Sequence, residues 1–279
     1  MSINEQTTIL VTGASGRTGG QVLEQLSEAG ANVRAATRHP ETLPERFRSR
    51  AVALDMNDPG SLVAALDDVD AVFLMWPFFE GPADTRAKVA PIASILGERV
   101  RKVVYLSSQT VEREPDTMWE AVENAITEVV GEWTILRPTG FARNAEQWMP
   151  QLANSDVVRF PFAEMARPLI HEHDIAATAV QVLLDDVHQG RRYVLSGPEL
   201  VSQRRQLELL GEAAGRSLRF EEIDRVAAER DLDLPAEMLD AWASFIDEPE
   251  PVTGEVEKLT GRQAKSFAVW AADNATVFR

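Results

Sequence analysis

The sequence predicts an α/β protein, built on a doubly wound parallel sheet with a smaller, mostly helical C-terminal domain. Short apolar segments alternate with helical segments up to about residue 140, which favours parallel strands joined by right-handed crossovers. The stretch from Thr8 to Gly30 joins an apolar strand, a glycine-rich turn and an amphipathic helix. Beyond Phe141 the alternation weakens and most segments have helical periodicity. Together these observations predict a Rossmann-type domain followed by a second region.

The glycine-rich turn is the first candidate binding element. Gly13 permits a tight turn, Gly16 lets the backbone approach a phosphate, and Gly19 lets the helix pack closely. The helix that follows carries Val22, Leu23, Leu26 and Ala29 on one face and ends at Gly30. A purely structural turn is the alternative, because a glycine pattern alone is a weak signal. The residues expected to contact a dinucleotide here are Gly13, Ser15, Gly16, Arg17, Thr18 and Gly19.

A second strand is predicted over 32–37 and ends at Arg38. About 20 residues after the glycine turn, an NAD-binding chain places an acidic residue on the ribose 2′-hydroxyl. A cation at this position suits a 2′-phosphate instead, so Arg38 predicts NADP(H) as the cofactor. Arg17 and Arg34 are possible helpers. For all three, a solvated surface arginine is the alternative.

Further strands are predicted over 51–54, 71–75, 102–106 and 133–136, with a last one at 193–195. Ligands of open α/β sheets bind outside the carboxyl ends of the strands, so the residues that follow each strand are candidates. The alternative is a loop aspartate for Asp55, packed core for Met75, Trp76 and Pro77, and a strand-end cap for Ser107. The candidates are Asp55, Met56, Met75, Trp76, Pro77, Ser107, Pro138 and Thr139.

The predicted helices follow the strands. Asp58 and Pro59 are an N-cap and a first helical residue. Asp174 is expected to cap another helix. The predicted helical ranges are 83–97, 116–130, 142–152, 175–184, 203–214, 224–230, 235–246, 256–259 and 264–275. Residues 157–162 look irregular, 218–221 predict a short strand, and 248–254 resemble a linker.

Composition excludes several classes of function. The 279 residues are 44% hydrophobic and carry a net charge of −16, which disfavours nucleic acid and anionic membranes as partners. The absence of cysteine excludes disulfides and thiol nucleophiles. No apolar run reaches the ~18 residues of a membrane span. The first eight residues lack the features of a signal peptide, so a cytoplasmic protein is expected.

Over nearly its whole length the sequence resembles the NmrA-like, NAD(P)-binding group of atypical short-chain dehydrogenases/reductases. The resemblance implies an NAD(P)-binding domain over residues 1–140, completed near 173–195, and a substrate-binding or lid region over 141–279. It also implies a ligand in the cleft between them, and supports Asp55 as a partner of the adenine amino group. The aromatic side chains expected to cover that cleft favour a small, apolar acceptor. The segments that carry the resemblance are TGASGRTGGQV, ATRHP, KVVYLSS, WTILRPTGFARN, HEHDIAATAV, YVLSGPE and VEKLTGRQAKSFAVWAADNA.

One departure from the superfamily affects the predicted chemistry. Its catalytic pair is a tyrosine followed four residues later by a lysine, but neither Tyr105 nor Tyr193 precedes such a lysine. Trp119 and Glu123 stand near where the pair would fall. The first hypothesis is therefore a reductase that transfers hydride from NADPH to a quinone, enone or similar apolar carbonyl without this pair. The second is a non-catalytic, NADP-binding redox sensor. Other chemistry, such as epimerisation or dehydration, is a third possibility, and the oligomeric state is left open.

Polar residues at the expected nicotinamide end are the remaining candidates. Ser108 and His171 are the candidate catalytic groups, and a strand-end cap and a packed histidine are the alternatives. His171 and His173 would lie on one side of a strand, but no further ligands converge, so no metal site is predicted. Gln109 and Asn144 are weaker candidates. Trp148, Met149 and residues 160–162 are expected to cover the cleft, with ordinary core as the alternative. His39 and His188 look like loop residues.

Overall fold

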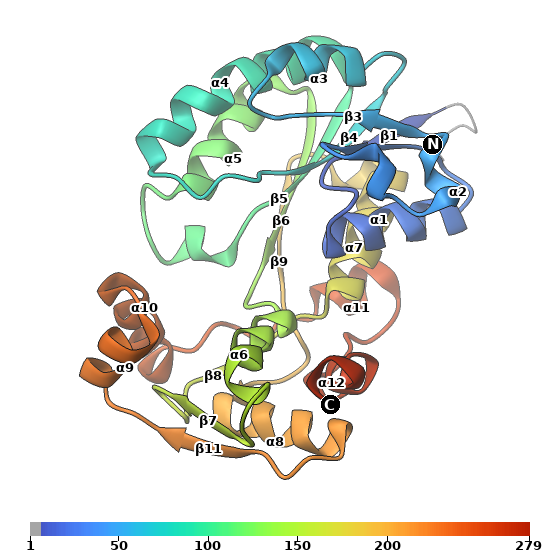
Figure 1. The fold of residues 1–279 in the computed structure, drawn as a ribbon. Helices are drawn as coiled ribbons and strands as arrows, with labels where there is room; N and C mark the ends of the chain where they lie inside the picture. The colour runs from blue at the N-terminus through green and yellow to red at the C-terminus, as the bar shows by residue number, and fades with distance from the viewer. Residues whose placement is uncertain (1–6) are drawn as a thin grey trace. The chain divides into compact units, whose positions relative to one another are not determined.

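The computed structural model describes residues 7–279 (Figure 1). The expectation that no signal peptide is present rests largely on residues 1–6, which lie outside the described residues. The chain divides into two compact units. The first contains the residues up to Pro138, Glu172–Leu195 and Lys258–Gly261. The second contains Thr139–His171, Ser196–Glu257 and Arg262–Arg279.

The first unit is built on one sheet of seven strands. Every pair of neighbouring strands is parallel, and the order is β3-β2-β1-β4-β5-β6-β9. The predicted Rossmann-type fold is therefore confirmed, with its topological switch point between β1 and β4. The strands are β1 (Thr8–Val11), β2 (Asn32–Thr37), β3 (Ala51–Ala53), β4 (Ala71–Met75), β5 (Lys102–Leu106), β6 (Glu132–Pro138) and β9 (Arg191–Leu195).

Helices cover both faces of this sheet (Figure 1). Helices α1 (Arg17–Glu28) and α7 (Glu172–Leu184) pack together on one face. On the other face α4 (Pro82–Arg99) packs against α3 (Pro59–Ala65) and α5 (Met118–Val129). Apolar side chains from the strands and from α3–α5 form the core there. The short elements that were not predicted are α2 (Glu45–Arg48) and the 3-10 helices η1 (Pro40–Thr42), η2 (Gln109–Glu112) and η4 (Asp186–His188).

Capping interactions set where these helices begin and end. Asp58 Oδ1 accepts a hydrogen bond from the amide of Gly60 at 2.9 Å, which confirms it as the N-cap of α3. Helix α5 begins two residues later than predicted, because Thr117 is its cap and Asp116 has a left-handed backbone (φ 54°). Helix α1 ends at Glu28, which leaves Ala29 exposed instead of on the buried face.

The start of α7 corrects two predictions. The helix begins at Glu172, so Asp174 lies inside the first turn and is not the N-cap. His173 is likewise helical, so His171 and His173 do not share a strand. The acidic side chains of Glu172 and Asp174 in the first turn instead complement the positive end of the helix dipole.

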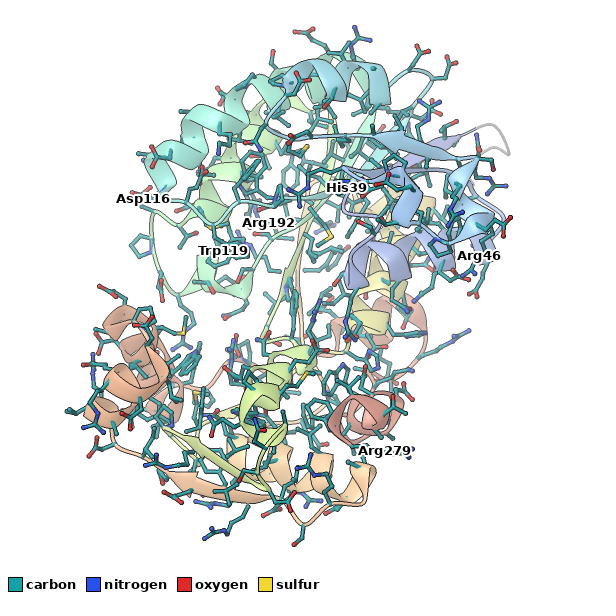
Figure 2. All side chains as sticks on the ribbon, viewed as in Figure 1. His39, Arg46, Asp116, Trp119, Arg192 and Arg279 are labelled. Carbon is teal, nitrogen blue, oxygen red and sulfur yellow. The ribbon has the colours of Figure 1, made fainter. Side chains whose placement is uncertain are left out.

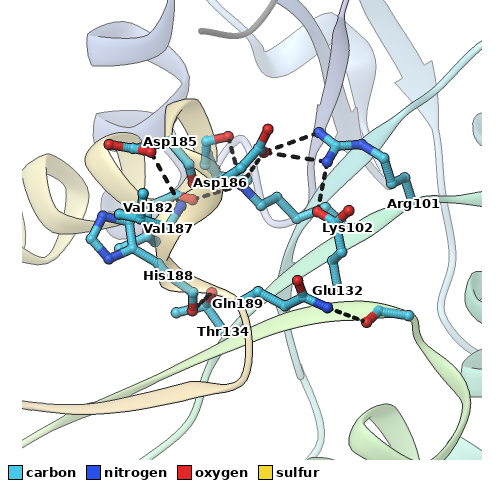
Figure 3. A network of polar contacts seen from close by, with 12 residues as sticks. Arg101, Lys102, Glu132, Thr134, Val182, Asp185, Asp186, Val187, His188 and Gln189 are labelled. Atoms are coloured by element: carbon cyan, nitrogen blue, oxygen red, sulfur yellow. Dashed lines mark hydrogen bonds and ion pairs between the residues drawn. The ribbon is translucent and has the colours of Figure 1, made fainter. Parts of the chain in front are cut away.

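A buried lysine joins β5 to the end of α7 (Figure 3). The Lys102 side chain is 1% exposed, and its Nζ donates to the carbonyl oxygens of Val182 (3.1 Å) and Asp185 (2.7 Å). The same Nζ forms an ion pair with Asp186 at 3.2 Å. Burial lowers the pKa of Lys102, and the bond and charge of Asp186 oppose that shift only in part. Lys102 therefore satisfies carbonyl groups that the helix end leaves without intrahelical donors.

Replacing Lys102 with methionine is expected to lower the free energy of unfolding by about 1–3 kcal/mol, because buried carbonyl oxygens then lose their donor. Urea unfolding of both proteins measures the difference. The control is Lys265→Met, which removes a more exposed ion pair with Asp273 (3.2 Å) and should cost at most about 1 kcal/mol. Equal losses in the two variants would contradict a special role for Lys102.

The second unit is mostly helical with two small sheets. Strand β7 (Val157–Phe160) pairs in parallel with β11 (Arg219–Glu222), so the expectation that residues 157–162 are irregular is wrong for 157–160 and holds only for 161–162. Strands β8 (Ala166–Arg167) and β10 (Val201–Ser202) are antiparallel. The helical elements are η3 (Ala142–Trp148), α6 (Met149–Leu152), α8 (Gln203–Ala214), α9 (Arg225–Leu232), α10 (Ala236–Asp247), α12 (Phe267–Asp273) and η5 (Ala275–Phe278), with α11 (Glu255–Thr260) spanning a unit boundary.

The aromatic core of this unit favours the second of two interpretations, since residues expected to cover the cleft had ordinary core as the alternative. Trp148 is fully buried, and its ring meets those of Phe160 (6.0 Å between centroids) and Phe220 (6.2 Å) edge-on. These two predicted covering residues, Trp148 and Phe160, are therefore core side chains. Residues 248–254 are also more than a linker, because Glu250 is buried and forms a two-bond ion pair with Arg167.

Candidate functional site

A cavity of about 380 Å³ lies in the first unit, at the carboxyl ends of strands β1 to β4. This is the edge of the sheet, beside the switch point, where open α/β sheets bind ligands. Predicted residues that line it are Gly13, Ser15, Gly16, Arg38, Asp55, Met56, Met75, Trp76 and Pro77. Lining residues that were not predicted are Thr12, Ala36, Thr37, Leu54, Asn57 and Phe78.

The glycine turn leaves no space for side chains on its inner side. Gly13 has a left-handed backbone (φ 64°), and the amide of Gly16 donates to its carbonyl at 2.9 Å. A Cβ atom at Gly19 would lie 2.3 Å from the Gly13 carbonyl oxygen. Only a glycine at position 19 therefore allows α1 to start directly against the turn. The resulting backbone cradle fits a pyrophosphate, because the first-turn amides of a helix lack intrahelical acceptors.

Threonine and serine hydroxyls brace this cradle. Thr12 Oγ1 donates to the Phe73 carbonyl (3.1 Å) and accepts from the Met75 amide (2.7 Å), which ties β1 to β4. Ser15 Oγ lies 2.8 Å from Thr37 Oγ1, which joins the turn to the end of β2. Thr12 and Thr37 were missed, although each stands at a strand end, directly before Gly13 and Arg38 respectively.

Arg34, within β2, and Arg38, directly after β2, have different environments. Arg38 is exposed, lines the cavity, and within residues 7–279 forms no hydrogen bond or ion pair. Arg34 Nη1 donates instead to the carbonyl oxygens of Ala65 (3.0 Å), the last residue of α3, and of Asp67, two residues further on. Arg34 does not line the cavity, so the structure offers no support for it as a helper in phosphate binding. Arg38 retains all five guanidinium donors for an oxyanion.

The lining of the cavity also combines a carboxylate with apolar groups. Asp55 Oδ1 accepts from the backbone amide (2.9 Å) and the side-chain amide (3.1 Å) of Asn57, which fixes the carboxylate after β3. The Trp76 ring packs edge-on against Phe78 with centroids 5.1 Å apart. The buried Nε1 of Trp76 finds no hydrogen-bond partner among the described residues. This wall can hold a flat, partly polar group.

The remaining predicted residues do not line this cavity. Thr18 and Gly19 are buried in the first turn of α1, where Arg17 is exposed. Pro138 is the last residue of β6. Ser108 accepts from the amide of Thr110 (3.2 Å) and donates to its hydroxyl (2.9 Å), so it caps η2.

Two further candidates belong to the second unit. Thr139 Oγ1 donates to the Pro168 carbonyl at 2.7 Å. His171 is 6% exposed, and its Nε2 lies 3.4 Å from Asp273 Oδ2. Across the described part of the chain, no three His, Asp or Glu side chains are grouped to hold a metal ion.

A buried carboxylate stands where the superfamily's catalytic pair was expected. Glu123 on α5 is 1% exposed and accepts from Ser107 Oγ (2.5 Å) and twice from Arg137 (2.6 and 2.9 Å). Arg192, which is labelled in Figure 2, lies 3.3 Å from it and stacks over Trp133. Burial lowers the pKa of Arg137, but the bonds and charge of Glu123 outweigh this and raise the pKa. Because Ser107 donates its proton to Glu123, its oxygen can only accept from a ligand.

The tyrosines do not replace the missing pair. Tyr105 is fully buried, and burial, followed by the charge of Glu123, raises its pKa well above the ordinary value. Tyr193 is hydrogen-bonded through its hydroxyl to His188 Nδ1 at 2.8 Å. Trp119 is half-buried and packs against the α3–α5 core. His188 is buried in η4, whereas His39 is exposed beside Glu41.

None of the helices within residues 7–279 combines the length and the apolar character needed to cross a membrane.

A second cavity lies within the second unit, and Asn144 is the one predicted candidate that lines it. Its other lining residues were not singled out in the sequence as ligands.

Comparisons with known proteins place this architecture among nicotinamide-dependent proteins. The chain is 36% identical to a (4-alkanoyl-5-oxo-2,5-dihydrofuran-3-yl)methyl phosphate reductase of Streptomyces griseus, over 97% of this chain and 99% of that one. It is 28% identical to an NAD(P)H azoreductase of Xenophilus azovorans, over 97% and 99%. An NADPH-dependent quinone oxidoreductase of Escherichia coli, solved with NADPH, shares the fold with a TM-score of 0.78 and 18% identity, covering 96% and 99%.

The family comparison covers almost all of the chain. The sequence pattern described as the NmrA-like family matches residues 5–273, which takes in the glycine turn, the whole seven-stranded sheet and most of the second unit. With that match and the 36% identity over nearly full length, the chain belongs to the NmrA-like family.

Proposed function

We propose that this protein is an NADPH-dependent reductase of electron-poor, conjugated acceptors such as quinones and enones. The observation that carries the proposal is Arg38, a cation with no other partner among the described residues, in the wall of a cavity that begins at the glycine turn. The relatives support it. The Streptomyces griseus reductase acts on an unsaturated, acylated furanone, and the Xenophilus azovorans relative is an NAD(P)H azoreductase.

Different residues of the first cavity would contact different groups of the cofactor. The backbone of Gly13 and Gly16, with the start of α1, would hold the pyrophosphate. Arg38 would pair with the 2′-phosphate, since guanidinium geometry matches a phosphate. Asp55 would accept from the adenine amino group. Met75, Trp76 and Pro77 would line the groove along the cofactor.

The chemistry is compatible with the missing tyrosine–lysine pair. When bound, the cofactor supplies a hydride, and the protein supplies position and environment. A conjugated acceptor that gains a hydride becomes an enolate or a hydroquinone anion, which can take its proton from water. The buried Tyr105 and the ion-paired Glu123 are then not required as acids. The hydroxyl of Ser107 donates its hydrogen to Glu123, so its oxygen would accept a hydrogen bond from a donor group of the cofactor.

Replacing Arg38 with alanine is expected to weaken NADPH binding by about 10- to 100-fold, the equivalent of one or two charge-assisted hydrogen bonds. NADH binding should change little, because NADH has no 2′-phosphate. Titrations of cofactor fluorescence measure both dissociation constants. The control is Arg46→Ala, which removes an exposed arginine paired with Glu24. An unchanged NADPH affinity in Arg38→Ala would overturn the assignment of the phosphate site.

A panel of acceptors tests the reaction class. Quinones, enones, acylated unsaturated lactones and simple ketones are each incubated with NADPH, and consumption of the cofactor is followed by its absorbance. We expect turnover with the conjugated acceptors and little with simple ketones, which need an acid at the carbonyl oxygen. Tight NADPH binding with no turnover across the panel would instead favour the non-catalytic, cofactor-binding alternative.

A further inference from the structure

The second unit contains a cavity of about 380 Å³ that the cofactor assignment does not use. Its walls come from η3, the segment around β8, α8 and α10. One part of the lining is apolar and includes Met165, Leu169 and Trp242. Another part carries side-chain amides, the carboxylate of Glu146 and two arginines, Arg143 and Arg167. A cavity of this size with a few polar groups in an apolar lining is typical of a small-molecule site.

Arg167 is a structural part of the wall. Its guanidinium forms two hydrogen bonds with the buried Glu250, at 2.6 and 2.8 Å, and stacks over Phe245 at 4.4 Å. A Cβ atom at Gly140 would lie 2.7 Å from its Cζ, so the backbone also packs against it. The charge of Arg167 is therefore compensated, and its position is set by packing.

Arg143 is more exposed than Arg167 and makes fewer and longer hydrogen bonds. Its side chain is 34% exposed, and its contact with Glu146, one turn along the same 3-10 helix, has a length of 3.4 Å. That distance is at the long limit of a hydrogen bond. A guanidinium has five N–H donors, so most of those of Arg143 remain available to a ligand. Partial burial beside apolar side chains strengthens its attraction for an anion.

We infer that this cavity binds the acceptor through an oxyanion head group, a phosphate monoester or carboxylate, with Arg143 as the recognising cation and the apolar wall against the body of the molecule. That the ligand is the acceptor rests on the proposed function, whereas the binding of an oxyanion in this cavity does not. Because the chain has a net charge of −16, an anionic ligand needs a local cation to be retained. The substrate of the Streptomyces griseus relative, a phosphate ester that carries an alkanoyl group, has this combination of parts.

Isothermal titration with simple amphiphiles tests the inference without cofactor or turnover. Octyl phosphate, octanoate and octanol are titrated into the full-length protein. We expect at least one of the two anions to bind 10-fold or more tightly than octanol, and Arg143→Gln to remove that advantage. The expected loss of about 10-fold corresponds to one charge-assisted hydrogen bond. High salt should weaken anion binding to the wild-type protein and have little effect on Arg143→Gln.

Three controls separate this cavity from other causes of anion binding. Arg159→Gln removes an exposed arginine of the same unit, paired with Glu221 at 3.0 Å, and should leave binding unchanged. Arg38→Ala removes the proposed phosphate partner in the first unit and should also leave binding unchanged. Thermal unfolding of Arg143→Gln should match that of the wild type. Octanol binding as tightly as both anions, or equal anion binding by Arg143→Gln, would overturn the inference, whatever the acceptor panel shows.

Discussion

Replacing Gly19 with alanine is expected to abolish NADPH binding and to destabilise the first unit by about 3 kcal/mol or more, the upper range for overpacking. The added Cβ would lie 2.3 Å from the carbonyl oxygen and 2.7 Å from the carbonyl carbon of Gly13. These are backbone atoms of the turn itself, so relief requires the turn to move away from α1. A displaced turn no longer presents the backbone cradle between β1 and the helix.

Gly20 provides a matched control in the same helix. A Cβ there would lie 3.4 Å from the Ala14 carbonyl oxygen, which is ordinary contact. Gly20→Ala should keep NADPH binding and gain up to about 1 kcal/mol from helix propensity. Urea unfolding and NADPH titration are measured on both variants. Wild-type affinity in Gly19→Ala would refute the close approach of turn and helix.

Replacing Glu123 with alanine is expected to cost about 3–5 kcal/mol, the usual penalty for leaving a buried charge without its partner. Arg137 (13% exposed) would then keep only the more exposed Glu112, at 3.1 Å, as a counter-charge, and Arg192 would lose its contact with Glu123. Ser107 would lose its acceptor at the same time. Glu123→Gln keeps the shape but not the charge, so it should lose less.

The control for this prediction is Glu128→Ala on the same helix. Glu128 is exposed, so its removal should change the free energy of unfolding by no more than about 0.5 kcal/mol. Chemical unfolding of the three variants gives the comparison. If Glu123→Ala were as stable as Glu128→Ala, the network around Glu123 would not hold α5 to β6 and β9.

Local rules explain why much of the first unit could be predicted. The alternation of apolar strands and helices, the cap at Asp58 and the glycine at position 30 depend on neighbouring residues. The glycine turn and Arg38 follow from their spacing along the chain. Thr12 and Thr37, by contrast, have hydroxyls whose bracing role depends on partners in other segments.

The features that were missed depend on residues far apart in sequence. Lys102 opens an apolar strand, and its partner Asp186 lies 84 residues away. Glu123 is bound by Arg192, 69 residues away, and Glu250 pairs with Arg167 across 83 residues. Such pairs cannot be read from periodicity. Periodicity also cannot separate a core aromatic such as Trp148 from one that lines a pocket, because both are apolar positions on a helical face.

The most direct test of the central claim is the stoichiometry of reduction by the purified wild-type protein. NADPH consumption and formation of the reduced acceptor are followed together, with an unsaturated acyl lactone or a quinone as acceptor. The account predicts one reduced acceptor for each NADPH oxidised, with NADPH preferred over NADH and the preference lost in Arg38→Ala. NADPH bound but not oxidised in the presence of every conjugated acceptor tested would contradict it.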